Sequence, residues 1–323
     1  MTEGAGRKPW YERFGGIGGS GTASQSIRRT GIPVPQGGTF QGRPPPRRRE
    51  QVDEDLEALW SAQSRADRRA EVTTVDWLTR TGTLRLGFDV VDGRPFSFQP
   101  GNLVRVEAHV PGKGYHRGTY CIAVPPSEYH RFELLVRVVE GGRMSAYLAT
   151  LRLGDEVAFR GPAGRSMARF AAGGPDLVLI ATGVGVAPLY SLASTLLRAG
   201  DGRRVDLYWG LRTTDDLCLT AELDRLADAH DNFRHHVSLS QPDGGWTGLR
   251  GRVTESVPAA LPPLETQRFI LAGNGAMIEE FSAALQEIGV LQEAIYEEAY
   301  FSARHVPDPE VVAAIVERFP AGT

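Results

Sequence analysis

Two different patterns of apolar residues follow one another along this chain. From Glu71 to about Phe159, short alternating runs are separated by turn signals such as DG, PGKG and PPSE; the runs are EVTTVDWL, TLRLGFDV, NLVRVEAHV, GTYCIAV, FELLVRVV and DEVAFRG. Alternation of this kind indicates half-buried strands, and repeated short strands at this spacing predict an antiparallel barrel or sandwich. A single helical pattern, SAYLATL, interrupts them.

The second pattern of apolar residues begins after GPAGRSMARFAAGGP. Apolar strands now alternate with helical patterns: DLVLIAT before APLYSLASTLLRAG, RVDLYWG before LTAELDRLADAH, FRHHVSLS, RFILAGNG before AMIEEFSAALQEIG, and a last strand IYEEAYF. This alternation predicts parallel β-α-β units in a doubly wound sheet. A length of 323 residues also favours two domains. We expect a barrel domain over 71–170, an α/β domain over 171–302, and a tail over 303–323 with a short helix in PEVVAAIVERF.

Residues 1–70 read as an arm without a core, with a possible short helix. Glycine and proline are dense in its first fifty residues, a composition typical of disordered segments. The same stretch holds nine Lys or Arg against three Glu, a net charge of +6, whereas the whole chain carries −3. Such an arm could touch an acidic protein, a membrane surface or nucleic acid. We expect a solvated tail, and no nucleic-acid partner.

Cysteine use and hydropathy exclude several classes. Cys121 and Cys218 are the only cysteines and lie far apart, so the sequence indicates no disulfide framework and no zinc site. An iron-sulfur cluster needs more thiolate or histidine ligands than this spacing offers. No apolar run is long enough to span a membrane, and the first residues lack a secretory signal. We therefore expect a cytoplasmic protein without a metal.

Two glycine-bearing turns follow strands of the second domain. ATGVGVAP, residues 181–188, leaves a buried strand and opens a helix, so its amides could approach an anion, and Pro188 suits the first helical turn. LAGNGAM, residues 271–277, is a second such turn. Ligands collect at the carboxyl ends of strands in open α/β sheets. The pair favours a dinucleotide site, although two ordinary tight turns would look the same.

The first domain carries matching features. In HRGTYCIA, Arg117, Tyr120 and Cys121 suit a flavin that lies against a barrel: the arginine would neutralise a phosphate and the tyrosine ring would stack on the isoalloxazine. EGGRMSAYL, residues 140–148, would add a phosphate cradle of glycines followed by Ser145 with its hydroxyl and free amides. A lone strand tyrosine is more often only half-buried.

Taken in order, these motifs resemble the ferredoxin-NADP(+) reductases and their relatives. RGTYCIA is similar to the flavin-stacking motif Arg-x-Tyr-Ser, GGRMSAYL to the pyrophosphate loop, and GDEVAFRGPAG to the strand that closes the flavin barrel. ATGVGVAP, LYWGLR, GRVT, AGNGAM and YEEAYF follow in the pyridine-nucleotide half. The resemblance runs from about 71 to 301 and implies FAD in the barrel, NADPH or NADH in the α/β domain, and hydride transfer between them.

The resemblance also implies roles for single residues. Arg117 should bind the FAD pyrophosphate, Tyr120 should stack on the flavin, and Glu298 and Tyr300 should match the terminal Glu-x-aromatic of the family, with Glu297 as an alternative register. Cys121, Glu298 and Tyr300 are the candidate catalytic residues. The candidate cofactor-binding residues are Arg117, Tyr120, Cys121, Gly142, Met144, Ser145, Thr182, Gly183, Gly185, Pro188, Arg212, Gly273, Met277 and Tyr300.

Three positions depart from the family pattern. Cys121 stands where a serine is usual, and a thiol is a weaker donor. Ala272 replaces the cysteine that commonly begins the nicotinamide-side motif. Arg212 resembles the arginine that meets the 2′-phosphate of NADP, which favours NADPH, but Ser240 stands where a second arginine is often found.

We interpret the sequence as an FAD-dependent NAD(P)H reductase that passes electrons to a separate carrier such as ferredoxin or flavodoxin. Since such carriers are usually acidic, the basic arm would steer their approach. One alternative is a reductase component of an oxygenase or a free-flavin reductase. Another is a non-catalytic subunit that binds flavin and nucleotide and bridges electrons. The sequence leaves the oligomeric state open.

Overall fold

The computed structural model describes residues 68–110, 114–126, 130–261, 267–300 and 306–320. The expectations for the arm, including its short helix and its basic surface, concern residues 1–67 and lie outside the described residues. Residues 68–70 belong to the first strand instead of the arm. The strand starts early because Arg68 pairs with Phe159 on a neighbouring strand and its guanidinium binds Asp92 at 2.9 Å.

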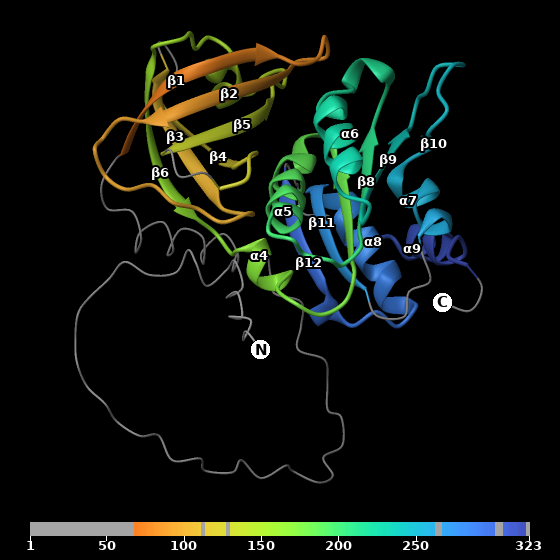
Figure 1. The fold of residues 1–323 in the computed structure, drawn as a ribbon. Helices are drawn as coiled ribbons and strands as arrows, with labels where there is room; N and C mark the ends of the chain where they lie inside the picture. The colour runs from red at the N-terminus through yellow and green to blue at the C-terminus, as the bar shows by residue number, and fades with distance from the viewer. Residues whose placement is uncertain (1–67, 111–113, 127–129, 262–266, 301–305, 321–323) are drawn as a thin grey trace, which may run out of the picture. The chain divides into compact units, whose positions relative to one another are not determined.

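The first domain is one curled antiparallel sheet (Figure 1). Its strands pair in the order β4-β3-β6-β1-β2-β5, and an isolated bridge from Ile122 to Leu134 brings the two edge strands together. The predicted barrel of short strands is therefore confirmed as a half-closed barrel. The strands are β1 (Arg68–Trp77), β2 (Thr83–Val90), β3 (Leu103–Val110), β4 (Gly114–Cys121), β5 (Arg131–Arg137) and β6 (Glu156–Ala163).

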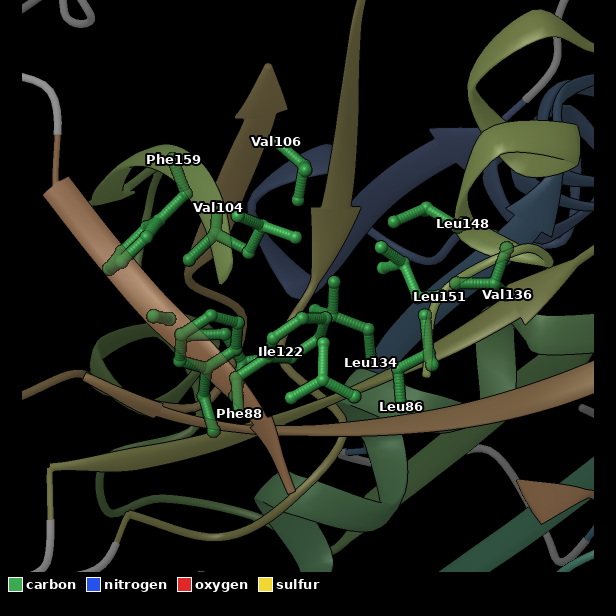
Figure 2. Packing of buried hydrophobic residues seen from close by; sticks show 14 of the residues in the cluster. Leu86, Phe88, Val104, Val106, Ile122, Leu134, Val136, Leu148, Leu151 and Phe159 are labelled. Carbon is green, nitrogen blue, oxygen red and sulfur yellow. The ribbon is translucent and has the colours of Figure 1, made fainter. Parts of the chain in front are cut away.

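Alternating residues of these strands meet inside the barrel, where Figure 2 shows Phe88, Val104, Leu134 and Phe159 among others. Phe88 stacks on Phe132 with ring centroids 4.9 Å apart. Each such side chain contributes about 1.5–3 kcal/mol on burial. Helix α3 (Arg143–Leu148) covers one end by placing Leu148 in the same cluster, so the loop before α3 is held to β4 by core packing.

The second domain is a parallel sheet with helices on both faces, as the sequence predicts. Helices α5 and α6 lie on one face, and α7, α8 and α9 on the other (Figure 1). The strand order is β10-β9-β8-β7-β11-β12. The strands are β7 (Leu177–Thr182), β8 (Val205–Leu211), β9 (Phe233–Leu239), β10 (Leu249–Arg250), β11 (Arg268–Asn274) and β12 (Ile295–Tyr300); the helices are α5 (Val186–Arg198), α6 (Thr220–Ala229), α7 (Val253–Ser256), α8 (Gly275–Glu287) and α9 (Pro309–Val316).

This strand order places a switch point at the centre of the sheet. The chain moves from β7 to β8 and β9 in one direction, then returns to β11 on the other side of β7. Ligands bind outside the carboxyl ends of the strands at such a point. The two predicted glycine turns lie at the carboxyl ends of β7 and β11. The first follows Thr182, the last residue of β7, and the second includes Gly273, near the end of β11.

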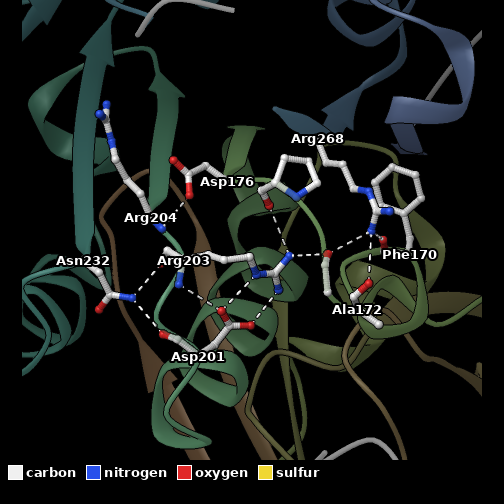
Figure 3. A network of polar contacts seen from close by, with 10 residues as sticks. Phe170, Ala172, Asp176, Asp201, Arg203, Arg204, Asn232 and Arg268 are labelled. Carbon is white, nitrogen blue, oxygen red and sulfur yellow. Dashed lines mark hydrogen bonds and ion pairs between the residues drawn. The ribbon is translucent and has the colours of Figure 1, made fainter. Parts of the chain in front are cut away.

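Two arginines fix the segment that joins the domains, which includes helix α4 (Met167–Phe170) (Figure 3). Arg268 on β11 donates to the carbonyl oxygens of Phe170, at 2.6 Å, and of Ala172, at 3.3 Å. Arg203 donates to the carbonyl oxygen of Gly173 at 2.7 Å and is itself paired with Asp201 at 2.6 Å. The backbone that enters the second domain is therefore fixed to its sheet by hydrogen bonds.

Candidate active site

Strand β4 presents its predicted flavin residues on two different faces. Its register with β3 is unbroken from Cys121 back to Gly114, so side chains alternate strictly. Tyr120 packs against the interior cluster of the barrel, whereas Cys121 belongs to a separate cluster with Leu103. Arg117 lies on the face of Cys121 and is exposed. The structure therefore groups Arg117 with Cys121 instead of with Tyr120.

The ring of Tyr120 folds back along its own strand. A methyl group added at Gly118 would come within 2.8 Å of the Tyr120 ring and 3.1 Å of Met144 on α3. Glycine at 118 therefore lets the tyrosine lie beside the helix that follows the predicted pyrophosphate loop. The structure thus places Tyr120 and Met144 in the same cluster beside Gly118.

The loop before α3 is closed by its own serine. Ser145 is buried; its hydroxyl accepts from the Val139 N–H at 3.3 Å and contacts the Gly142 carbonyl at 3.5 Å. A Cβ at Gly142 would lie 2.5 Å from the Ser145 hydroxyl oxygen, so only glycine fits. We expected this hydroxyl to be offered to a phosphate, but in the structure it shapes the loop.

Strand β12 resolves the uncertain register of the two glutamates. Glu297 points toward α8 and accepts a hydrogen bond from Ser282. Glu298 lies on the opposite side, with Tyr296 and Tyr300 at alternate positions along the same face. Glu298 and Tyr300 therefore face the same region as Cys121, and Glu297 does not.

Cys121 and Tyr300 contact each other through the thiol sulfur and the phenol oxygen. This contact joins β4 of the barrel to β12 of the α/β domain. Burial raises the pKa of the Cys121 thiol well above its usual value, and the nearby Glu298 raises it further. The thiol is therefore neutral near pH 7, and burial likewise keeps the Tyr300 phenol protonated by raising its pKa.

Glu298 is the ionisable group of this cluster that titrates near neutrality. Burial raises its pKa to about 7, against lowering by a hydrogen bond from Tyr296 and by the charge of Arg165. The Tyr296 hydroxyl lies 3.4 Å from the Glu298 carboxylate and 3.2 Å from the Arg165 carbonyl oxygen. A carboxyl group in this range can hold or release a proton at physiological pH.

The two glycine turns of the second domain pack closely against each other. A Cβ at Gly185 would lie 2.3 Å from the Ala272 carbonyl oxygen, and one at Gly273 would lie 2.3 Å from the Thr182 hydroxyl. That hydroxyl accepts a hydrogen bond from the Asn274 N–H at 2.8 Å. Both glycines are therefore required by close packing of the turns. Asn274 also caps α8, a role that sequence reasoning missed.

Gly183 is different, because a Cβ there would meet nothing within 4 Å while its φ of +54° favours glycine. Its carbonyl accepts from the indole of the buried Trp209 at 2.8 Å. Gly183 thus faces open space at the switch point. Pro188 lies in the first turn of α5, as the sequence predicts, and it is buried.

Met277 is placed in the core cluster with Phe281, and its N–H donates to the Asn274 cap. Its side chain therefore packs in the core of the second domain. Arg212 follows β8, and its Nε donates to Gln241 at 3.2 Å. Ser240 pairs through its N–H with the Leu211 carbonyl, so the ends of β8 and β9 lie side by side at Arg212.

Hydrogen bonds and an ion pair connect the two domains. The Ser191 hydroxyl on α5 donates to the Val124 carbonyl at 2.6 Å, just after β4. Thr81 donates to Asp216 at 2.6 Å, and Arg85 pairs with Glu222 at 2.6 Å. Within the described ranges no helix combines the length and apolarity that a membrane crossing needs. Nor do the described His, Cys, Asp and Glu residues form a group suited to a metal ion.

Comparisons with known proteins agree with this geometry. Residues 78–167 match the oxidoreductase FAD-binding domain family and residues 179–283 the oxidoreductase NAD-binding domain family. The chain is 36% identical over 173 residues to Ferredoxin--NADP reductase B of Sorangium cellulosum (strain So ce56), which covers 54% of this chain and 70% of that protein. It is 32% identical over 221 residues to the phenol 2-monooxygenase reductase component DmpP of Pseudomonas sp. (strain CF600), covering 67% of this chain and 62% of that protein.

A solved structure, the Amycolatopsis cytochrome P450 reductase GcoB, superposes with a TM-score of 0.65 at 30% identity, over 72% of this chain and 69% of that one. The family matches indicate FAD and NAD(P)H as cofactors. The open turn at Gly183 fits such a cofactor, since a Cβ there would meet nothing within 4 Å and the backbone is free of side-chain bulk. The chain belongs to the ferredoxin-NADP(+) reductase family of FAD- and NAD(P)-binding oxidoreductases.

Proposed function

We propose that this chain takes electrons from NADPH or NADH through FAD and passes them to a separate carrier protein such as ferredoxin or flavodoxin. The observation that carries the proposal is the contact between Cys121 on β4 and Tyr300 on β12. It brings the strand with the predicted flavin motif to the strand next to the glycine turns. A donor ring and an acceptor ring bound on either side would meet there.

The flavin, when bound, accepts two electrons with a hydride and can release them singly. The residues of this chain would bind and orient it: Tyr120 would offer a ring for stacking and the Gly142–Ser145 loop would hold the phosphates, whereas Tyr300 would line the site from the Cys121 side of β4. Arg117 stays a predicted phosphate ligand; from its face of β4 it would have to reach around the edge of the strand. Glu298 holds a proton near this centre, because its pKa lies near neutrality.

On the nucleotide side, Thr182, Gly183, Gly185 and Gly273 form the paired turns at the switch point. In this proposal the diphosphate approaches at Gly183, where the turn opens to free space. Arg212 would meet the adenosine end and favour NADPH through its fixed charge. The measurement that tests the proposal is anaerobic titration of the purified yellow protein with each nicotinamide, followed at flavin wavelengths. A flavin that neither nucleotide bleaches would contradict it and would favour the non-catalytic electron-bridging role.

A second candidate is a reductase component that serves one oxygenase. The likeness to an oxygenase reductase component and to a P450 reductase favours it. The first half-reaction is common to both candidates, so only the acceptor separates them. Steady-state turnover should be compared with a ferredoxin, a flavodoxin, an oxygenase component and free flavin. The acceptor with the highest kcat/KM identifies the role.

A further inference from the structure

Tyr296, the first residue of the YEEAYF motif, contacts Glu298 on the last strand, and Arg165 in turn contacts Tyr296. Tyr296 lies two positions before Glu298 on the same face of β12 and is buried. Arg165 lies between β6 and α4, in the segment that joins the two domains. Neither residue belongs to the predicted site.

Arg165 holds Tyr296 from two sides. Its carbonyl oxygen lies 3.2 Å from the Tyr296 hydroxyl, and its guanidinium carbon lies 5.6 Å from the centre of the tyrosine ring. Phe170, at the end of α4, packs on the same ring with centroids 5.5 Å apart. Since Arg268 fixes the Phe170 carbonyl to β11 (Figure 3), the position of the Tyr296 hydroxyl is set by the segment that joins the domains and by the sheet of the second domain.

A phenol hydroxyl in this place can satisfy Glu298 in either protonation state. It is one donor and also an acceptor. When Glu298 is ionised, the hydroxyl can donate to the carboxylate oxygen, which lies 3.4 Å away. When Glu298 is protonated, the carboxylic acid can donate to the phenol oxygen while the phenol donates to the Arg165 carbonyl. The carboxyl group would keep its orientation as its proton comes and goes.

The titratable and charged groups that face Glu298 lie on β4, on β12 and in the segment before α4. Cys121 on β4 and Tyr300 on β12 are neutral at pH 7, because burial raises the pKa of each. Burial also raises the pKa of Tyr296. Arg165 supplies a positive charge that favours the ionised form of Glu298, whereas Glu297 turns away to Ser282.

We propose that Tyr296 and Arg165 are positioning residues that hold the Glu298 carboxyl and allow it to exchange a proton beside the Cys121–Tyr300 contact. The inference rests on the proposed function, since it assigns Glu298 a proton at the reaction centre. It does not depend on which carrier accepts the electrons. Both residues act through Glu298 and touch no cofactor in this scheme.

The test uses the FAD-loaded protein with Tyr296→Phe and Arg165→Leu. The carboxyl band of Glu298 is followed by infrared spectroscopy from pH 5 to 9 on the oxidised enzyme, and Glu298→Gln identifies the band. Loss of a hydrogen bond to an ionised group should move the midpoint of Tyr296→Phe upward from about 7 by about one unit. Arg165→Leu should move it upward less, and only at low salt, because its exposed charge is screened.

The matched controls are Tyr208→Phe and Arg169→Leu. Tyr208 lies in the hydrophobic core of the second domain and donates to the Ala260 carbonyl, and Arg169 is an exposed arginine of α4. Neither change should move the Glu298 midpoint. The pH profile of flavin reduction by NADPH should shift in parallel with the infrared midpoint. If Tyr296→Phe leaves the midpoint where the wild type has it, the inference is overturned, even though NADPH still bleaches the flavin; if no nicotinamide bleaches the wild type, the proposed function fails instead.

Discussion

The thiol of Cys121 and the phenol of Tyr300 are in direct contact although 179 positions separate them in the chain. Because burial raises the pKa of both groups, a neutral thiol and a neutral phenol meet where the barrel joins the last strand of the sheet, and the thiol is a weak donor. A serine at 121 would donate a stronger hydrogen bond than a thiol.

We therefore expect Cys121→Ser to speed flavin reduction up to about tenfold, the rate equivalent of one ordinary hydrogen bond. Anaerobic stopped-flow bleaching with NADPH measures this. Cys218→Ser is the control, since Cys218 is buried beside Arg85 and Glu222 and outside the cluster of Cys121. A slower Cys121→Ser enzyme would show that the thiol is not a weak substitute for a hydroxyl.

Tyr120→Ala should weaken FAD binding by about tenfold, because an aromatic stacking contact contributes about 0.5–1.5 kcal/mol beyond its buried area. Tyr120→Phe keeps the ring and should retain FAD. The readouts are flavin content after gel filtration and the FAD dissociation constant from flavin fluorescence. Equal flavin content in all three proteins would refute stacking by this residue.

The sequence predicts the architecture well because strand alternation and strand–helix alternation are local patterns. All six barrel strands and the strands of the parallel sheet other than β10 follow from them, as does the placement of both glycine turns at strand ends. Glycine itself is ambiguous in sequence: Gly183 is open to space, whereas Gly185 and Gly273 are forced by packing against the other turn. Only the three-dimensional pairing of β7 with β11 separates these cases.

The residues that sequence reasoning missed depend on long-range contacts. Tyr296 shares a strand face with Glu298, and this two-residue period was a usable signal, but its partner Arg165 lies 131 positions away. For Ser145 the reason is local instead. Its hydroxyl accepts a hydrogen bond from the Val139 N–H, only six positions earlier in the chain. Met277 reads as part of a nucleotide turn in the sequence, yet the first turn of α8 directs it into the core.

Gly185→Ala and Gly183→Ala should differ in stability. At Gly185 the added Cβ would overlap backbone of Ala272 at 2.3 Å, so the turns must separate and the free energy of unfolding should fall by more than about 3 kcal/mol. At Gly183 only the left-handed φ is strained, at a cost of about 1 kcal/mol. Urea unfolding of both variants measures the difference, and equal losses would contradict the packing argument.

Arg212→Ala should raise the KM for NADPH by about tenfold and leave the KM for NADH unchanged, since only NADPH carries a 2′-phosphate for the guanidinium to bind. The effect should shrink at high salt because Arg212 is exposed. Arg234→Ala, at an exposed position of β9, is the control. If both nucleotides lose affinity equally, Arg212 does not read the 2′-phosphate.

Glu298 should make the stability of the protein fall as the pH rises toward 8. Its pKa in the folded protein, about 7, lies above its ordinary value of 4.5, so the folded state binds this proton more tightly than the unfolded state does. The stabilisation is therefore complete below about pH 4.5 and is lost as the pH passes through about 7. Its size is at most about 3 kcal/mol. Glu298→Gln mimics the protonated form and should lose less stability between pH 5 and 8 than the wild type, by urea unfolding at matched salt. Parallel curves for the two proteins would mean that Glu298 ionises in the folded state at its ordinary pH.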